Sequence, residues 1–196
     1  LIALLQTSHQ ALRTAAIYTL TTIADPAVEA LCRVLNEAGE RVSRGEDPPD
    51  HDFRWITLHD ASYALGAIGA PAVGPLSKLL ESPFEWSRMN AAFALGEMGP
   101  DAVAAAPSLE AALEDKSHYV IRLAANSLGA IGSDTAAEPL SRLLSADAPG
   151  WDEEKNWGWT VRDAVNVTAA IALARLGHRA ADSEGALVEP LWNPFD

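Results

Sequence analysis

The chain has 196 residues, of which 48% are hydrophobic, and its 14 basic and 27 acidic residues give a formal net charge of −13. This charge repels nucleic-acid phosphates and anionic lipid, and no run approaches the roughly 20 apolar residues of a membrane-spanning helix, so we expect neither partner. The single cysteine, Cys32, excludes an internal disulfide and a cysteine-based zinc site, and its apolar surroundings predict a buried structural thiol.

A leucine-based repeat runs along the chain. The motif Leu-Gly-x-(Ile/Met)-Gly begins at Leu65, Leu95 and Leu128, with degenerate copies at Leu20 and Leu173. Further leucines lie 15 residues from several of these motif leucines. A repeat of this kind predicts a stacked array in which each unit holds two similar helices, A and B.

The predicted units follow one another in chain order. Residues 1–5 align with a B helix that lacks its A helix, which predicts a fragment of a longer protein. Five helical hairpins follow at roughly residues 9–38, 53–82, 83–115, 117–146 and 158–193. Helix A of the third hairpin is expected to begin at Ser82, a capping residue followed by Pro83 and Glu85. Its helix B is expected to bend at Pro107.

The Ala-Leu-Gly-x-Ile-Gly turns and the Pro-Leu-x-x-Leu-Leu segments that begin at Pro75 and Pro139 resemble HEAT repeats of the short bacterial, phycobilin-lyase-like type. The resemblance covers nearly the whole chain. It implies an all-α, right-handed α-α superhelix of about five hairpins. It implies little about activity, because such arrays serve as scaffolds, as peptide-binding domains and occasionally as enzymes.

Two B-to-A intervals are longer than the repeat requires. They take 30 and 29 residues between repeat leucines, where the other intervals take 15. The extra residues predict insert loops at 39–54 and 146–158. Both loops belong to the same type of junction, so we expect them to emerge from the same edge of the array, where insertions often form a binding face.

Both inserts are acidic and aromatic, and aromatic residues in the first turns of the intervening helices extend the pattern. We expect one aromatic row along this edge, with carboxylates that select a basic partner. The predicted partner-binding residues are Trp55, Trp86, Tyr119, Trp157, Trp159, Asp50, Asp52, Glu153 and Glu154. In the alternative interpretation, the aromatic residues staple each helix onto the preceding unit, and the acidic residues only complement helix dipoles.

The sequence offers no recognisable catalytic arrangement. HEAT-like deoxyhypusine hydroxylases hold two irons with repeated His-Glu pairs, and only the pair of His59 and Asp60 comes close here. HEAT-like DNA glycosylases need a basic groove for phosphate, which the acidic composition argues against.

We therefore predict a non-catalytic scaffold that binds a protein or a basic peptide through its acidic, aromatic edge, without cofactor or metal. The alternative is an accessory, lyase-like domain of an enzyme, in which the aromatic row grips a small organic ligand. No signal peptide is visible after Leu1, so a cytoplasmic location is expected.

Overall fold

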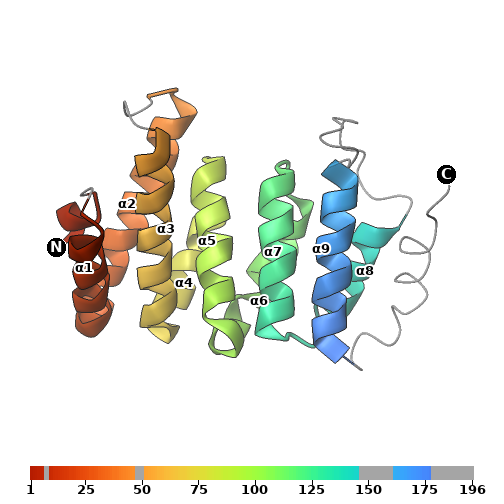
Figure 1. The fold of residues 1–196 in the computed structure, drawn as a ribbon. Helices are drawn as coiled ribbons and strands as arrows, with labels where there is room; N and C mark the ends of the chain where they lie inside the picture. The colour runs from red at the N-terminus through yellow and green to blue at the C-terminus, as the bar shows by residue number, and fades with distance from the viewer. Residues whose placement is uncertain (7–8, 47–50, 146–160, 178–196) are drawn as a thin grey trace.

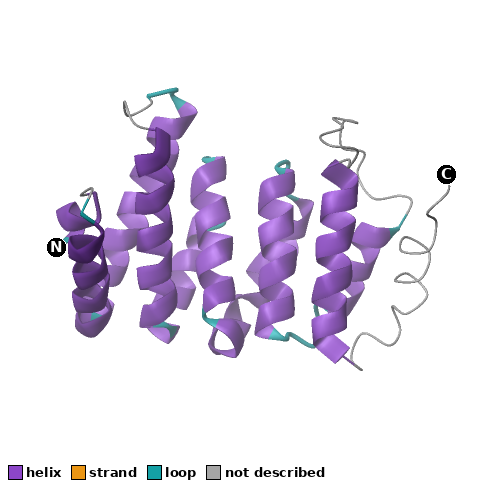
Figure 2. Ribbon diagram, viewed as in Figure 1, coloured by secondary structure: helices purple, strands orange, loops and turns teal. Residues whose placement is uncertain are grey.

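The computed structural model describes residues 1–6, 9–46, 51–145 and 161–177. Every regular element in these ranges is a helix (Figure 2). The helices stack side by side into an elongated all-α solenoid, as the sequence predicts (Figure 1). No helix in the described ranges is long and apolar enough to cross a membrane.

The helices form two layers (Figure 1). The A layer consists of α1 (Gln10–Ile23), α3 (His51–Ile68), α5 (Glu85–Glu97), α7 (His118–Ile131) and α9 (Val161–Leu176). The B layer consists of α2 (Asp25–Ser43), α4 (Ala70–Leu79), α6 (Ala106–Ala111) and α8 (Ala137–Leu144). Three short 3₁₀ helices complete the described elements: η1 (Ile2–Gln6), η2 (Gly99–Ala105) and η3 (Ala112–Glu114). Each A helix packs against the next A helix along the array.

The repeat leucines fill the space between the two layers. They are all buried: Leu5, Leu20, Leu35, Leu65, Leu80, Leu95, Leu113, Leu128, Leu144 and Leu173. Buried alanines lie beside them, and small side chains allow helices to approach closely. The leucines and alanines belong to a single hydrophobic cluster that runs along the array, so each hairpin is stabilised by its neighbours.

The first glycine of the Leu-Gly-x-(Ile/Met)-Gly motif lies where two A helices meet. A Cβ atom on Gly96 would lie 2.4 Å from Oγ of Ser127 in the next A helix. A Cβ atom on Gly129 would lie 2.7 Å from Cα of Ala172. The motif therefore encodes the close contact between successive units, because a side chain at this position would push the helices apart.

The second glycine of the motif ends helix A with a positive φ. Gly69 has φ 80° and ψ −139°, and the degenerate copy places Ala24 in a similar conformation, with φ 55° and ψ −117°. A side chain in such a conformation costs about 1–3 kcal/mol, whereas glycine mainly gains freedom in the unfolded chain.

We expect Ala24→Gly to raise the free energy of unfolding by about 1 kcal/mol, because the released backbone strain exceeds the entropy cost of glycine. Chemical denaturation measures this change. Gly69→Ala is the matched variant, since its added Cβ would meet nothing within 4 Å and should lower stability through the backbone alone. If Ala24→Gly left stability unchanged or reduced it, the strain assigned to this turn would be wrong.

The insert loop predicted at 39–54 is wrong in its extent. Helix α2 continues to Ser43 and α3 begins at His51, so most of this segment lengthens the two helices, which project beyond their neighbours in Figure 1. Glu40 and Arg44, one turn apart, form an ion pair that favours the extra helical turn. The second predicted loop, 146–158, lies outside the described residues.

Three local predictions have mixed outcomes. The interruption near Pro107 is confirmed, because η2, α6 and η3 replace one continuous B helix. The start of the third A helix is wrong, since α5 begins at Glu85 and the Ser82 hydroxyl instead donates to Oδ1 of Asn36 over 2.7 Å. Residues 1–5, predicted as a B helix, form mainly the short 3₁₀ helix η1.

Cys32 lies on α2 and is partly buried against the core. Burial, followed by the negative charge of Glu29, raises the pKa of its thiol from 9.0 to about 11. The thiol is therefore protonated at neutral pH, which agrees with the predicted structural role because the thiolate is the reactive form.

Candidate functional site

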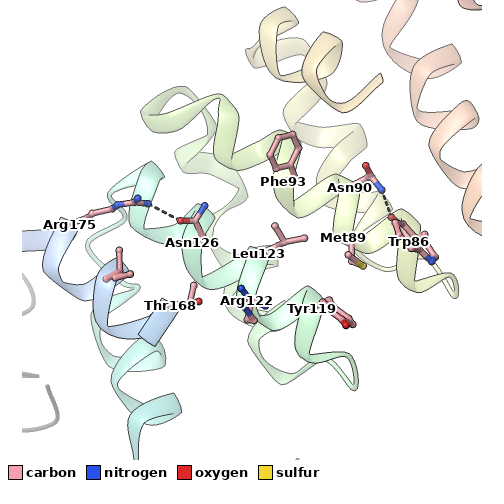
Figure 3. A pocket seen from close by; sticks show the side chains of 11 residues that line it. Trp86, Met89, Asn90, Phe93, Tyr119, Arg122, Leu123, Asn126, Thr168 and Arg175 are labelled. Carbon is pink, nitrogen blue, oxygen red and sulfur yellow. Dashed lines mark hydrogen bonds between the residues drawn. The ribbon is translucent and has the colours of Figure 1, made fainter. Parts of the chain in front are cut away.

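A pocket of about 420 Å³ opens on the A layer between α5, α7 and α9 (Figure 3). We call this pocket the A-face groove. It is lined by Trp86, Met89, Asn90 and Phe93 from α5, by Tyr119, Arg122, Leu123 and Asn126 from α7, and by Thr168, Ile171 and Arg175 from α9. Six of these eleven side chains are aromatic or aliphatic.

The position of each lining residue in the repeat explains why it faces the groove. Phe93, Asn126 and Ile171 each lie two residues before the buried leucine of their helix, and Trp86 and Tyr119 each lie nine residues before it. At about 100° per residue, both offsets place a side chain on the side of the helix opposite the leucine. The repeat that builds the core therefore also aligns the groove.

The aromatic side chains differ in exposure. Trp86 is half-buried and packs against the core, whereas Tyr119 is 49% exposed. The ring of Tyr119 lies 3.9 Å from that of His118, centroid to centroid. Phe93 meets Tyr63 of α3 edge to face at 5.2 Å, which extends the aromatic surface beyond the groove toward the N-terminus.

Side-chain amides connect neighbouring A helices at the groove. Asn90 accepts a hydrogen bond from the Ser62 hydroxyl of α3 at 2.8 Å and donates to the Trp86 carbonyl at 2.8 Å. Arg175 of α9 donates from Nη1 to Oδ1 of Asn126 at 2.8 Å (Figure 3). These contacts tie α3 to α5 and α7 to α9, so they fix the walls of the groove relative to one another.

A buried ion pair joins the N-terminal ends of α5 and α7. The guanidinium of Arg88 donates to both carboxylate oxygens of Asp115, over 2.6 Å from Nε and 3.0 Å from Nη2. Asp115 also accepts from the backbone N–H of Ser117 at 2.8 Å, and Ser117 caps α7. The pair therefore sets the spacing between the first turns that carry Trp86 and Tyr119.

The structure brings together two of the predicted partner-binding residues, Trp86 and Tyr119, which line the same groove. Trp55 and Asp52 lie in α3, but their side chains are outside the described part of the chain. The other predicted residues also lie outside the described ranges: Asp50, Glu153, Glu154, Trp157 and Trp159. A continuous acidic, aromatic row thus stays a prediction. The half-buried state of Trp86 supports a packing contribution for that ring.

The sequence reasoning missed most of the groove. The missed lining residues are Met89, Asn90, Phe93, Arg122, Leu123, Asn126, Thr168, Ile171 and Arg175. A usable signal was the position two residues before each repeat leucine, which holds Tyr18, Tyr63, Phe93, Asn126 and Ile171 in successive A helices. Reading this position down the array would have revealed an outward-facing row that is mostly aromatic or aliphatic.

The residue pair tested for iron binding has a different environment. Asp60 forms an ion pair with Arg13 at 3.0 Å, which links α3 to α1. The side chain of His59 is outside the described part of the chain. Among the described residues, no group of three or more His, Cys, Asp or Glu side chains is placed to hold a metal ion.

The two helical layers and their shared core define a helical-repeat solenoid with a surface groove. The family of HEAT repeats matches residues 51–125 and 73–154, which together span more than half of the chain. The chain therefore belongs to the HEAT-repeat family. No match was found among curated proteins.

Several solved structures are similar to this chain. One, the crystal structure of an engineered protein, has a TM-score of 0.51 at 20% identity and aligns with 100% of this chain and 88% of its own. A designed armadillo repeat protein has a TM-score of 0.48 at 20% identity, with 96% and 87% covered. Computationally designed armadillo repeat proteins for modular peptide recognition give 0.46 at 19% identity, with 97% and 88% covered. At these identities the likeness to the first structure concerns the fold.

Proposed function

We propose that this array is a non-catalytic binding module, and that it takes up an extended segment of another protein in the A-face groove. One observation carries the proposal: aromatic and aliphatic side chains from three successive A helices gather on one exposed face. Apolar surface that collects in one place on a soluble protein is typical of an interaction site, whereas single exposed apolar residues are not. Tyr119 and Ile171, at 49% and 47% exposed, leave much of their apolar surface uncovered.

The dimensions of the groove suit an extended chain. Packed helices lie about 8–10 Å apart, so a surface that crosses from α5 to α9 is roughly 20 Å long. An extended polypeptide advances about 3.3 Å per residue, which corresponds to about six residues across the groove. Aromatic rings supply large contact areas at low cost in side-chain entropy, so Trp86, Phe93 and Tyr119 are suitable anchors for such a segment.

Asn126 offers a polar contact at the centre of the groove. Its Oδ1 atom accepts the hydrogen bond from Arg175, which orients the amide and leaves its N–H groups pointing elsewhere. Within the described part of the chain, these N–H groups have no partner. An oriented amide donor suits a backbone carbonyl of a bound segment, which would otherwise lose its hydrogen bonds to water.

The proposal is tested with a library of random peptides displayed on phage and selected on the purified protein. Affinities of the recovered peptides are then measured by fluorescence anisotropy. We expect the double variant Tyr119→Ala/Ile171→Ala to weaken binding by roughly tenfold or more, because each truncation removes apolar contact area. Its thermal unfolding should change little, since both side chains are half-exposed on the helix surface.

Tyr18→Ala is the matched control. Tyr18 is 75% exposed and occupies the same repeat position as Ile171, but it lies on α1, away from the groove. Its truncation should leave peptide affinity unchanged. Failure to recover any peptide, or equal weakening by Tyr18→Ala and by the groove variant, would contradict binding in the A-face groove.

A small organic ligand is a second candidate, because the pocket volume of about 420 Å³ falls in the size range of small-molecule sites. Native mass spectrometry of the purified protein distinguishes the two. An adduct of defined mass that is lost in Tyr119→Ala/Ile171→Ala would favour the small ligand over the peptide.

A further inference from the structure

The A-face groove departs from the charge of the rest of the chain. Its described lining includes two arginines, Arg122 and Arg175, and no carboxylate. The chain as a whole carries 27 acidic and only 14 basic residues. The groove is therefore a local region of positive charge on an acidic protein, and its charge preference cannot be read from the net charge.

Neither arginine is neutralised within the described part of the chain. The ion pairs recorded there involve Arg13, Arg44 and Arg88, and neither groove arginine takes part in one. Both groove arginines are exposed. Their guanidinium groups are thus available to a ligand without first breaking an ion pair.

The two guanidinium groups converge on one stretch of α7. Arg175 reaches across from α9 and donates from Nη1 to Asn126, which holds its side chain against α7 (Figure 3). Arg122 lies four residues before Asn126 on the same helix. Residues at this separation are neighbours on a helix surface, with about 6 Å between Cβ atoms. Arg175 uses one of its five N–H groups on Asn126, so most of its donors stay available.

We propose that the segment bound in the groove carries an aspartate or glutamate side chain between apolar residues, and that Arg122 and Arg175 bind this carboxylate together. A planar guanidinium presents paired N–H donors that match the two oxygens of a carboxylate. The flanking apolar residues contact Phe93 and Tyr119 on either side of the cations. The inference rests on the proposed function and reverses the basic partner expected from the acidic inserts.

The experiment compares selections from one random-peptide library on two proteins, the wild type and Arg122→Gln/Arg175→Gln. Peptides from the wild type should be enriched in Asp or Glu next to aromatic or aliphatic residues. That acidic enrichment should disappear on the variant, while the apolar enrichment stays. Glutamine keeps the approximate size of the arginine stem and polarity at its end, so the comparison isolates the charge.

A mutant cycle on the best wild-type peptide then measures the contact directly. Replacing its acidic residue by the corresponding amide should weaken binding to the wild type by roughly tenfold, which corresponds to about 1.4 kcal/mol. The same replacement should have little further effect on Arg122→Gln/Arg175→Gln. Binding to the wild type should also weaken as salt rises, and binding to the variant should not.

Arg33→Gln/Arg142→Gln is the matched control, because it removes two exposed arginines of the B layer and changes the net charge equally. It should leave the selection unaltered. Peptides of neutral or basic composition that still require Tyr119 and Ile171 would overturn the acidic preference and leave the proposed function standing. Acidic peptides bound equally by the groove variant would also overturn the role of the two arginines. If no peptide were recovered from the wild type, both proposals would fail.

Discussion

Asp115→Ala is expected to lower the free energy of unfolding by about 3–5 kcal/mol, because it leaves the guanidinium of Arg88 buried without its carboxylate. The side chains of Arg88 and Asp115 are only 7% and 11% exposed. The Arg88 guanidinium keeps one hydrogen bond, from Nη1 to the Ser82 carbonyl at 2.9 Å, which does not neutralise its charge. Urea denaturation measures the loss.

The cost belongs to the unpaired charge more than to the missing contact. Removing both partners in Arg88→Met/Asp115→Ala should therefore be less destabilising than adding the effects of the two single variants, since no charge stays buried. Glu40→Ala is a matched control at the exposed pair with Arg44, where we expect a change of at most about 1 kcal/mol. Equal losses at the exposed and buried pairs would contradict this account.

The same ion pair connects stability to the groove. Arg88 lies on α5 between Trp86 and Met89, and Asp115 and Ser117 lie just before α7. A weakened pair should therefore loosen the first turns of α5 and α7, where Trp86 and Tyr119 lie. Hydrogen exchange at these turns should rise in Asp115→Ala even under conditions where the rest of the protein stays folded.

The fold was predictable because its core is periodic in the sequence. Each buried leucine recurs in the same position of a helical hairpin, and the two motif glycines mark a helix contact and a turn. The extent of the first insertion was not predictable from spacing alone, because extra residues between two repeat leucines can form either a loop or longer helices. The charged segment around Glu40 and Arg44 is compatible with a helix, and it forms one.

The groove was only partly predictable, for a different physical reason. Trp86 and Tyr119 were found because large aromatic residues near helix starts are conspicuous. The position opposite each repeat leucine holds tyrosine, phenylalanine, asparagine or isoleucine, so it shows no repeated residue identity. The pairing of Arg122 with Arg175 depends on the packing of α7 against α9, and a net charge of −13 conceals a local positive patch.

Gly129→Ala should destabilise the protein by about 1–3 kcal/mol, although alanine is the better helix former by about 1 kcal/mol. The added Cβ would lie 2.7 Å from Cα and 2.9 Å from Cβ of Ala172, and backbone atoms cannot rotate away. Helix α9 must therefore move away from α7. Because Arg175 reaches Asn126 across this contact, the same variant should also weaken peptide binding in the groove.

Gly66→Ala tests the same motif position in α3, where the conflict is mild. Its Cβ would lie 3.0 Å from Cβ of Glu97, an exposed residue, and 3.3 Å from the Ala94 carbonyl oxygen. The gain in helix propensity should nearly offset so small a displacement, so we expect a change near zero. Thermal unfolding of both variants decides between close packing and helix propensity. If Gly129→Ala were as stable as Gly66→Ala, the first motif glycine would not be required for the approach of neighbouring A helices, and the spacing of the groove walls would need another cause.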